Sequence, residues 1–158
     1  KRLPTEAEWE YASRGGVENL LFSWGNDPYI SSHANTWDGA FPYKNTKEDK
    51  FEFLAPVRSY PPNKFGLYDI SGNVWEWCYD WYTFDYYKLF QYEVADNPRG
   101  PQTSYDPNEP YLPKKIMRGG SFLCNKSYCT GYRNSMRMKS SPDTSSIHAG
   151  FRTVVDAM

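Results

Sequence analysis

The pattern of apolar and polar positions predicts one short helix near the start of the chain. Thr5-Glu6-Ala7-Glu8 has the form of a capping box, in which the threonine hydroxyl and the glutamate carboxylate each accept a hydrogen bond from the other residue's backbone amide. Glutamates in the first turn also suit the positive end of a helix dipole. Gly15-Gly16 then predicts the helix end after Arg14. We expect a plain structural helix here.

No sustained period of 3.6 or 2 runs through residues 20–65, where short aromatic pieces alternate with turn clusters. This stretch predicts loop with brief strands. A second loop is predicted over residues 95–114, which are polar and rich in proline.

Three later stretches predict strands. Residues 74–79 alternate after a tight turn at 71–73. Residues 116–122 predict a strand that carries a bend at Gly119-Gly120, and a last strand is expected over residues 150–155.

Composition indicates a folded but loop-rich domain. Aromatic residues make up 18% of the 158 residues, a content that disordered chains lack, while 12 prolines and 11 glycines interrupt regular elements.

The net charge of −1, without a basic run, argues against nucleic-acid binding. No apolar run approaches the roughly 18 residues that a membrane span needs. Because the chain opens on Lys1, we expect residues 1–158 to be one domain that lacks its N-terminal part, and localisation stays open.

The cysteines are the main chemical feature. Cys124 and Cys129 stand five positions apart, which puts them on opposite faces of a strand, or roughly 140° apart around a helix. Their sulfurs can meet only if the residues between them form a turn, for which Asn125 and Ser127 are suited. Cys78 has no partner of this kind and is expected to pack as a small apolar side chain.

Spacing alone leaves several uses for such a pair. A structural zinc site normally needs four nitrogen or sulfur ligands, and His33 and His148 are isolated. A disulfide across a short turn is feasible, as are two unrelated core cysteines. Two converging thiolates would also suit a soft ion such as Cu(I). By itself, the spacing favours the disulfide or the unrelated cysteines.

The residues around the cysteines resemble the active-site segment of formylglycine-generating enzymes, the sulfatase-modifying factors. Further stretches resemble the same family in the same order along the whole chain. The matching segments are Arg118–Cys129, Arg2–Tyr11, Phe41-Pro42 with Asn45, Ala55-Pro56-Val57, Pro61-Pro62-Asn63, Gly66-Leu67-Tyr68, Gly72–Trp77, Pro142–Ser145 and Gly150-Phe151-Arg152.

The resemblance implies an α+β, C-type-lectin-like fold with little regular secondary structure. It also implies a monomeric oxidase that uses molecular oxygen to convert the cysteine of a Cys-x-Pro-x-Arg segment in unfolded sulfatases to Cα-formylglycine. Cys124 and Cys129 match the copper ligands, Ser121 the active-site serine and Trp75 the aromatic wall of the oxygen pocket. The residues expected to contact the substrate peptide are Tyr128, Arg133, Ser145 and His148.

The family also implies two structural Ca²⁺ sites built from oxygen ligands. The first maps onto Asn35, the Thr36 carbonyl, Asp49 and the Phe51 carbonyl. Lys50 stands where the family usually has glycine, which could strain this turn. The second site maps onto Asp69, the Gly72 and Val74 carbonyls, and Glu76. Without the resemblance, these carboxylates would be ordinary turn and strand groups.

Two other functions stay open because fold alone does not decide function. One is a non-catalytic binding or structural protein on the same scaffold, although the pair Cys124 and Cys129 with Ser121 favours the enzyme. The other is a copper-independent thiol–disulfide oxidoreductase. Among the C-terminal arginines, Arg133, Arg137 and Arg152 are expected by default to pair with internal carboxylates.

Overall fold

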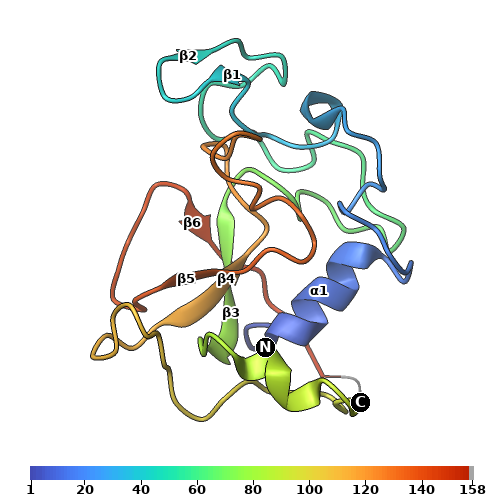
Figure 1. Cartoon of the computed structure of the whole chain (residues 1–158). Helices are drawn as coiled ribbons and strands as arrows, with labels where there is room; N and C mark the ends of the chain where they lie inside the picture. Colours follow the sequence, from blue (N-terminus) through green and yellow to red (C-terminus); the bar gives the residue numbers. More distant parts are fainter. Residues whose placement is uncertain (157–158) are drawn as a thin grey trace.

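A four-stranded sheet in the order β5-β4-β3-β6 lies at the centre of the structure, a computed structural model that describes residues 1–156 (Figure 1). The helix α1 lies beside this sheet, and β1 and β2 pair at one end of the molecule. The elements are α1 (Glu6–Arg14), the 3₁₀ helix η1 (Ile30–Ser32), β1 (Gly39–Ala40), β2 (Lys44–Asn45), β3 (Trp75–Trp81), the 3₁₀ helix η2 (Tyr86–Phe90), β4 (Lys115–Arg118), β5 (Met138–Ser140) and β6 (Ala149–Gly150).

The predicted helix is confirmed together with both of its end signals. The Glu8 N–H donates to the Thr5 hydroxyl at 3.2 Å, and the Thr5 N–H donates to the Glu8 carboxylate at 2.8 Å. At the other end Gly15 takes a left-handed φ of 60°, and its N–H bonds the Ala12 carbonyl at 3.2 Å. Local sequence therefore defines α1 at both ends.

The strand predictions are right in place but not in length. The strand predicted over residues 74–79 is β3, which runs two residues further, to Trp81. The strand predicted over 116–122 is wrong beyond Arg118, because Gly119 and Gly120 take φ values of 95° and 77° and turn the chain out of the sheet.

The last predicted strand, over 150–155, is also largely wrong. Only Gly150 belongs to β6, and Val154 forms an isolated bridge with Arg2. The sequence did not predict β5, η1 or η2. As expected, residues 20–65 hold only brief elements, and residues 95–114 hold no helix or strand.

The sheet separates two apolar clusters, and this separation positions the site. On one face Cys78 and Ile116 pack with Trp9 of α1 and with Ile70. On the other face Trp75 and Met117 pack with Phe22, Cys124 and Tyr132. Successive strand residues point to opposite faces, so neighbours along β3 and β4 serve different clusters. Cys78 is fully buried as a small apolar side chain, as predicted.

A buried ionic network ties α1 to the sheet. The Arg118 guanidinium, which is fully buried, donates to the carboxylates of Glu6 at 2.5 Å and Glu10 at 2.6 Å. Arg137 donates to the same Glu6 carboxylate at 2.7 Å. Removing one partner from such a network would leave a buried charge unpaired, so the network fixes the helix against the sheet.

Candidate active site

A cavity of about 440 Å³ opens at one end of the sheet, where β3 begins and β4 ends. Its wall comes from chain segments that lie far apart in the sequence. Six of the eight residues predicted for catalysis or substrate binding line it, namely Trp75, Ser121, Cys124, Tyr128, Cys129 and His148. The sheet thus gathers most of the predicted site into one space.

The loop between the two cysteines is the turn that their spacing required. The Asn125 carbonyl accepts hydrogen bonds from the backbone N–H groups of Tyr128 at 3.0 Å and Cys129 at 2.7 Å. The Asn125 side-chain oxygen accepts from both the N–H and the hydroxyl of Ser127, at 3.0 Å and 2.6 Å. The Cα atoms of Cys124 and Cys129 are consequently only 4.8 Å apart.

Cys124 and Cys129 are joined in a disulfide, one of the alternatives that their spacing had left open. Cys124 is 2% exposed at the floor of the cavity, whereas Cys129 is half-buried. The two sulfurs therefore converge in the same cavity. Reduction would release two neighbouring thiols at this point.

Ser121 and Trp75 lie beside the sulfurs. Ser121 is buried, its hydroxyl accepts from the Leu123 N–H at 3.3 Å, and its carbonyl accepts from the Cys124 N–H at 2.9 Å. Trp75 is the first residue of β3, and its N–H donates to the His148 carbonyl at 2.8 Å. Its ring lies against Gly131, where a β-carbon would collide with the ring carbons.

Aromatic rings form another part of the wall. The Phe41 ring stacks on the Tyr128 ring with centroids 4.8 Å apart, and the Trp37 ring meets Phe41 edge-on at 5.2 Å. Tyr128 is 72% exposed, so this stack faces solvent at the mouth of the cavity. Such a surface suits a peptide, because an aromatic ring gives large contact area at little entropic cost.

His148 supplies a polar group at the same wall. Its Nδ1 lies 3.0 Å from the Ser146 hydroxyl, and burial lowers the pKa of the imidazole. The imidazole is thus biased toward its neutral form. A neutral ring can both donate and accept a hydrogen bond.

Arg133 and Ser145 are exposed and do not line the cavity. Arg137 and Arg152 pair with internal carboxylates, as expected for these arginines, whereas no ion pair involves Arg133 within residues 1–156. The sequence reasoning did not predict seven residues of the wall as site residues, namely Phe41, Leu123, Thr130, Gly131, Met136, Arg137 and Met138. For the methionines, the available signal was that Met136 and Met138 stand two positions apart soon after Cys129, a spacing that can place both at one wall.

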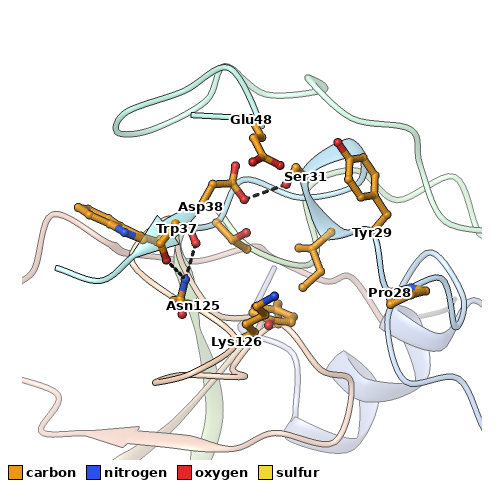
Figure 2. A pocket seen from close by; sticks show the side chains of 12 residues that line it. Pro28, Tyr29, Ser31, Trp37, Asp38, Glu48, Asn125 and Lys126 are labelled. Carbon is orange, nitrogen blue, oxygen red and sulfur yellow. Dashed lines mark hydrogen bonds between the residues drawn. The ribbon is translucent and has the colours of Figure 1, made fainter. Parts of the chain in front are cut away.

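A second cavity, of about 360 Å³, lies near the cysteine loop (Figure 2). The Asn125 amide donates to the Trp37 and Gly39 carbonyls at 2.9 Å, and the Ser31 hydroxyl donates to Asp38 at 2.8 Å. None of the residues predicted to bind copper or substrate lines this space. The predicted chemistry therefore belongs to the first cavity.

The residues predicted for the first Ca²⁺ site lie close together. The Asp49 carboxylate is buried and accepts from the N–H groups of Thr36 at 3.0 Å and Phe51 at 2.9 Å. Burial, with the nearby charge of Asp38, raises the pKa of Asp49, so a cation would favour its ionised form. Lys50 has a φ of 78°, the conformation for which glycine is the usual choice.

At the second predicted Ca²⁺ site, Glu76 already has protein partners. Arg152 donates to both Glu76 oxygens at 2.6 Å, and the Trp9 indole donates to one of them at 2.7 Å. Asp69 accepts from the Arg58 N–H at 2.6 Å. A cation here would have to share Glu76 with Arg152, and the site stays a prediction.

Within residues 1–156, no group of three or more His, Cys, Asp or Glu side chains could hold a metal ion. The first predicted Ca²⁺ site contains one carboxylate, the second contains two, and the copper prediction uses two cysteines. None of these sets reaches three such side chains, so this finding tests none of them. No helix of the described part has the length and apolar character to cross a membrane.

Comparison with protein families matches residues 1–157 to the sulfatase-modifying factor enzyme 1-like domain. The chain is 48% identical to the formylglycine-generating enzyme of Mus musculus over 158 residues, covering 99% of the chain and 39% of that protein. It is 43% identical to the formylglycine-generating enzyme of Thermomonospora curvata, covering 100% of the chain and 50% of that protein. An inactive C-alpha-formylglycine-generating enzyme 2 of Bos taurus is 36% identical and is matched over 96% of the chain and 43% of its own length.

Solved structures with the same fold include Treponema denticola variable protein 1, with a TM-score of 0.68 and 29% identity over 95% of the chain and 45% of that protein. PvdO from Pseudomonas aeruginosa has a TM-score of 0.67 and 27% identity over 95% of the chain and 50% of that protein. The expected loop-rich fold of this family is therefore confirmed. The chain spans half or less of the length of these relatives.

Proposed function

Because this chain belongs to the sulfatase-modifying factor enzyme family, we propose that it carries the active site of a copper-dependent oxidase. The substrate is the cysteine of a Cys-x-Pro-x-Arg segment in an unfolded sulfatase, and the product is Cα-formylglycine. The CH₂–SH group of that cysteine loses two electrons and two protons to dioxygen, which becomes hydrogen peroxide, and is left as a thioaldehyde. Water then hydrolyses the thioaldehyde to the aldehyde and releases the sulfur as hydrogen sulfide.

One observation carries this proposal: Cys124 and Cys129 converge at the floor of a cavity that is open to solvent. Once reduced, the two sulfurs are a soft donor pair, and thiolates select Cu(I) over harder ions. Two donors also leave room for a third sulfur, which the substrate cysteine supplies. The donor set therefore fits the metal.

Bound copper supplies the activation of dioxygen, which side chains cannot provide. The protein has the other tasks. Ser121 offers a buried hydroxyl that can hydrogen-bond a sulfur or an oxygen beside the cysteines, and Trp75 closes the wall against water. Phe41 and Tyr128 present an aromatic surface to the peptide, while the neutral His148 can bond a peptide backbone group.

The disulfide itself favours a second candidate, a copper-independent thiol–disulfide oxidoreductase. In that reaction a substrate thiolate would attack the Cys124–Cys129 bond, forming a mixed disulfide with one cysteine and releasing the other as a thiolate. A second substrate thiolate would then displace the bound cysteine, so the substrate leaves as a disulfide, both protein cysteines are reduced, and no aldehyde forms. A non-catalytic role on the same scaffold is the third alternative, since the family includes relatives named as inactive.

The test is mass spectrometry of a synthetic Cys-x-Pro-x-Arg peptide after incubation with the copper-loaded protein. We expect loss of the thiol and gain of an aldehyde. Copper removal, Cys124→Ser or Cys129→Ser should each abolish the product. Cys78→Ala is the matched control, because Cys78 is buried on the other face of the sheet and should leave the reaction intact.

The alternatives give different products in this assay. A peptide disulfide that still forms without copper would support thiol–disulfide exchange. An unchanged peptide would support a non-catalytic role. If both single cysteine variants form aldehyde at the parent rate, the copper proposal is wrong.

A further inference from the structure

Two methionines line the cavity that holds the paired cysteines. Met136 and Met138 contribute to its wall together with Cys124 and Cys129, so four sulfur-bearing side chains face one space of about 440 Å³. Met138 begins β5 and packs against the cluster that contains Cys124. The proposed function uses neither methionine.

Arg137, the residue between the two methionines, fixes their segment at the cavity wall. Met136, Arg137 and Met138 all line this space. Arg137, between the two methionines, sends its guanidinium to Glu6 on α1 at 2.7 Å and stacks on the Tyr82 and Tyr87 rings. These contacts of Arg137 hold the segment that carries both methionines at the wall of the cavity, where Met138 packs against the cluster that contains Cys124 and Cys129.

Exposure falls from the mouth of the cavity to its floor. Met136 is 37% exposed, Met138 and Cys129 are half-buried, and Cys124 is 2% exposed. A methionine that only fills a gap in a core is normally buried, whereas Met136 lies at the surface. The sulfurs therefore form a series that leads from solvent to the pair.

A thioether is chemically suited to be the first sulfur that binds a metal ion at the mouth of the cavity. Methionine sulfur is a soft donor of the kind that selects Cu(I). It carries no proton to lose and forms no disulfide, so it stays available when the cysteines are protonated or oxidised. It is also a neutral ligand, and a metal held by it can move on to a thiolate.

We propose that Met136 and Met138 form a loading site, which takes up Cu(I) at the mouth of the cavity and passes it to the reduced Cys124 and Cys129. This inference rests on the proposed function. The transfer is a ligand exchange: thioether–copper bonds break, thiolate–copper bonds form, and the thiol protons go to water. Copper stays Cu(I) throughout, so no oxidant or reductant is needed.

The test measures how fast the reduced protein removes Cu(I) from a coloured chelator complex under anaerobic conditions, followed by stopped-flow absorbance. Met136→Leu/Met138→Leu keeps side-chain volume while removing both sulfurs. We expect uptake by this variant to slow by about tenfold or more, the loss typical for supporting groups of a metal site. The amount of copper bound at equilibrium should not change, because the cysteines remain.

Met117→Leu is the matched control, because Met117 packs in the same cluster but does not line the cavity. It should load at the parent rate. An unchanged rate in the double variant overturns the inference, as does an equal slowing in Met117→Leu, which would indicate packing. If the parent protein takes up no copper, the proposed function itself fails, a result distinct from either of these.

Discussion

Gly131 controls where the Trp75 ring can lie. A β-carbon at this position would overlap two carbons of the indole ring, so the absence of a side chain allows Trp75 to form the cavity wall. Gly131 does not need a left-handed conformation, since its φ is not among the positive ones. Glycine is therefore needed at position 131 because the Trp75 ring packs directly against its backbone.

Gly131→Ala should displace the Trp75 ring and lower the free energy of unfolding by about 1–3 kcal/mol, the usual cost of overpacking. Urea denaturation measures the loss, and tryptophan fluorescence reports the altered environment of the ring. Ser135→Ala, an exposed site a few residues away, is the control and should be neutral. A Gly131→Ala protein as stable as its parent would show that the ring has room to move.

Asp80 links strand β3 to the start of α1. Its carboxylate accepts the Glu6 N–H at 2.8 Å, and burial raises the pKa of Asp80 from 3.8 to about 6. The folded protein thus holds this proton more tightly than the unfolded chain does. Its contribution to the free energy of unfolding is largest below about pH 4 and falls by about 2–3 kcal/mol as the pH rises to about 6.

Asp80→Asn keeps an oxygen to accept the Glu6 N–H but removes the titration. The stability of the variant relative to the parent should therefore rise between pH 4 and pH 7, by about the same 2–3 kcal/mol. Urea denaturation of both proteins across this range tests the effect. A constant difference between them would mean that Asp80 titrates near its ordinary pKa in the folded protein.

The helix α1 depends on its capping box, so Thr5→Ala should lower the free energy of unfolding by about 1 kcal/mol. Thr5→Ser retains the hydroxyl that the Glu8 N–H bonds and should retain most of the stability. Thermal denaturation of the two variants distinguishes loss of the capping hydroxyl from any other effect of replacing Thr5. Equal melting temperatures for both would argue that the cap contributes nothing.

Elements with strong local signals could be predicted, and elements that depend on distant partners could not. The start of α1 follows from Thr5 and Glu8, which are neighbours in sequence. In contrast, β5 and β6 are only three and two residues long, and they exist because β4 and β3 offer hydrogen-bonding edges. No periodicity can develop over so few residues.

The candidate site was predictable in part for a similar reason. The turn from Cys124 to Cys129 follows from local residues, and the sulfurs meet as the spacing required. The rest of the wall comes from distant segments: Met138 is held by the pairing of β5 with β4, and Phe41 stacks on Tyr128. Arg133 and Ser145 lie near the wall in sequence but are exposed outside it, which sequence proximity could not reveal.

The molecule as a whole has long loops and little regular structure. Because the predicted Ca²⁺ ligands come mostly from these loops, bound Ca²⁺ should hold the loops together and stabilise the folded protein. We expect Ca²⁺ to raise the free energy of unfolding by about 2.7 kcal/mol at a hundredfold excess over the dissociation constant. For a chain of this size that is a rise in melting temperature of roughly 5–10 °C. Differential scanning fluorimetry with Ca²⁺ and with a chelator measures it.

Asp49→Asn should remove the part of this rise that belongs to the first predicted site. Glu48→Gln, a neighbouring exposed carboxylate outside the predicted ligand set, is the control. If the melting temperature of the parent does not respond to Ca²⁺, the calcium prediction is wrong for both sites.

The most direct test of the proposed copper site is a titration of Cu(I) into the reduced protein against a chelator of known affinity. We predict tight binding of about one Cu(I) per chain, lost in Cys124→Ser and in Cys129→Ser and kept in Cys78→Ala, because two thiolates form the site. Parent-like Cu(I) binding in both Cys124→Ser and Cys129→Ser would contradict the proposed copper site.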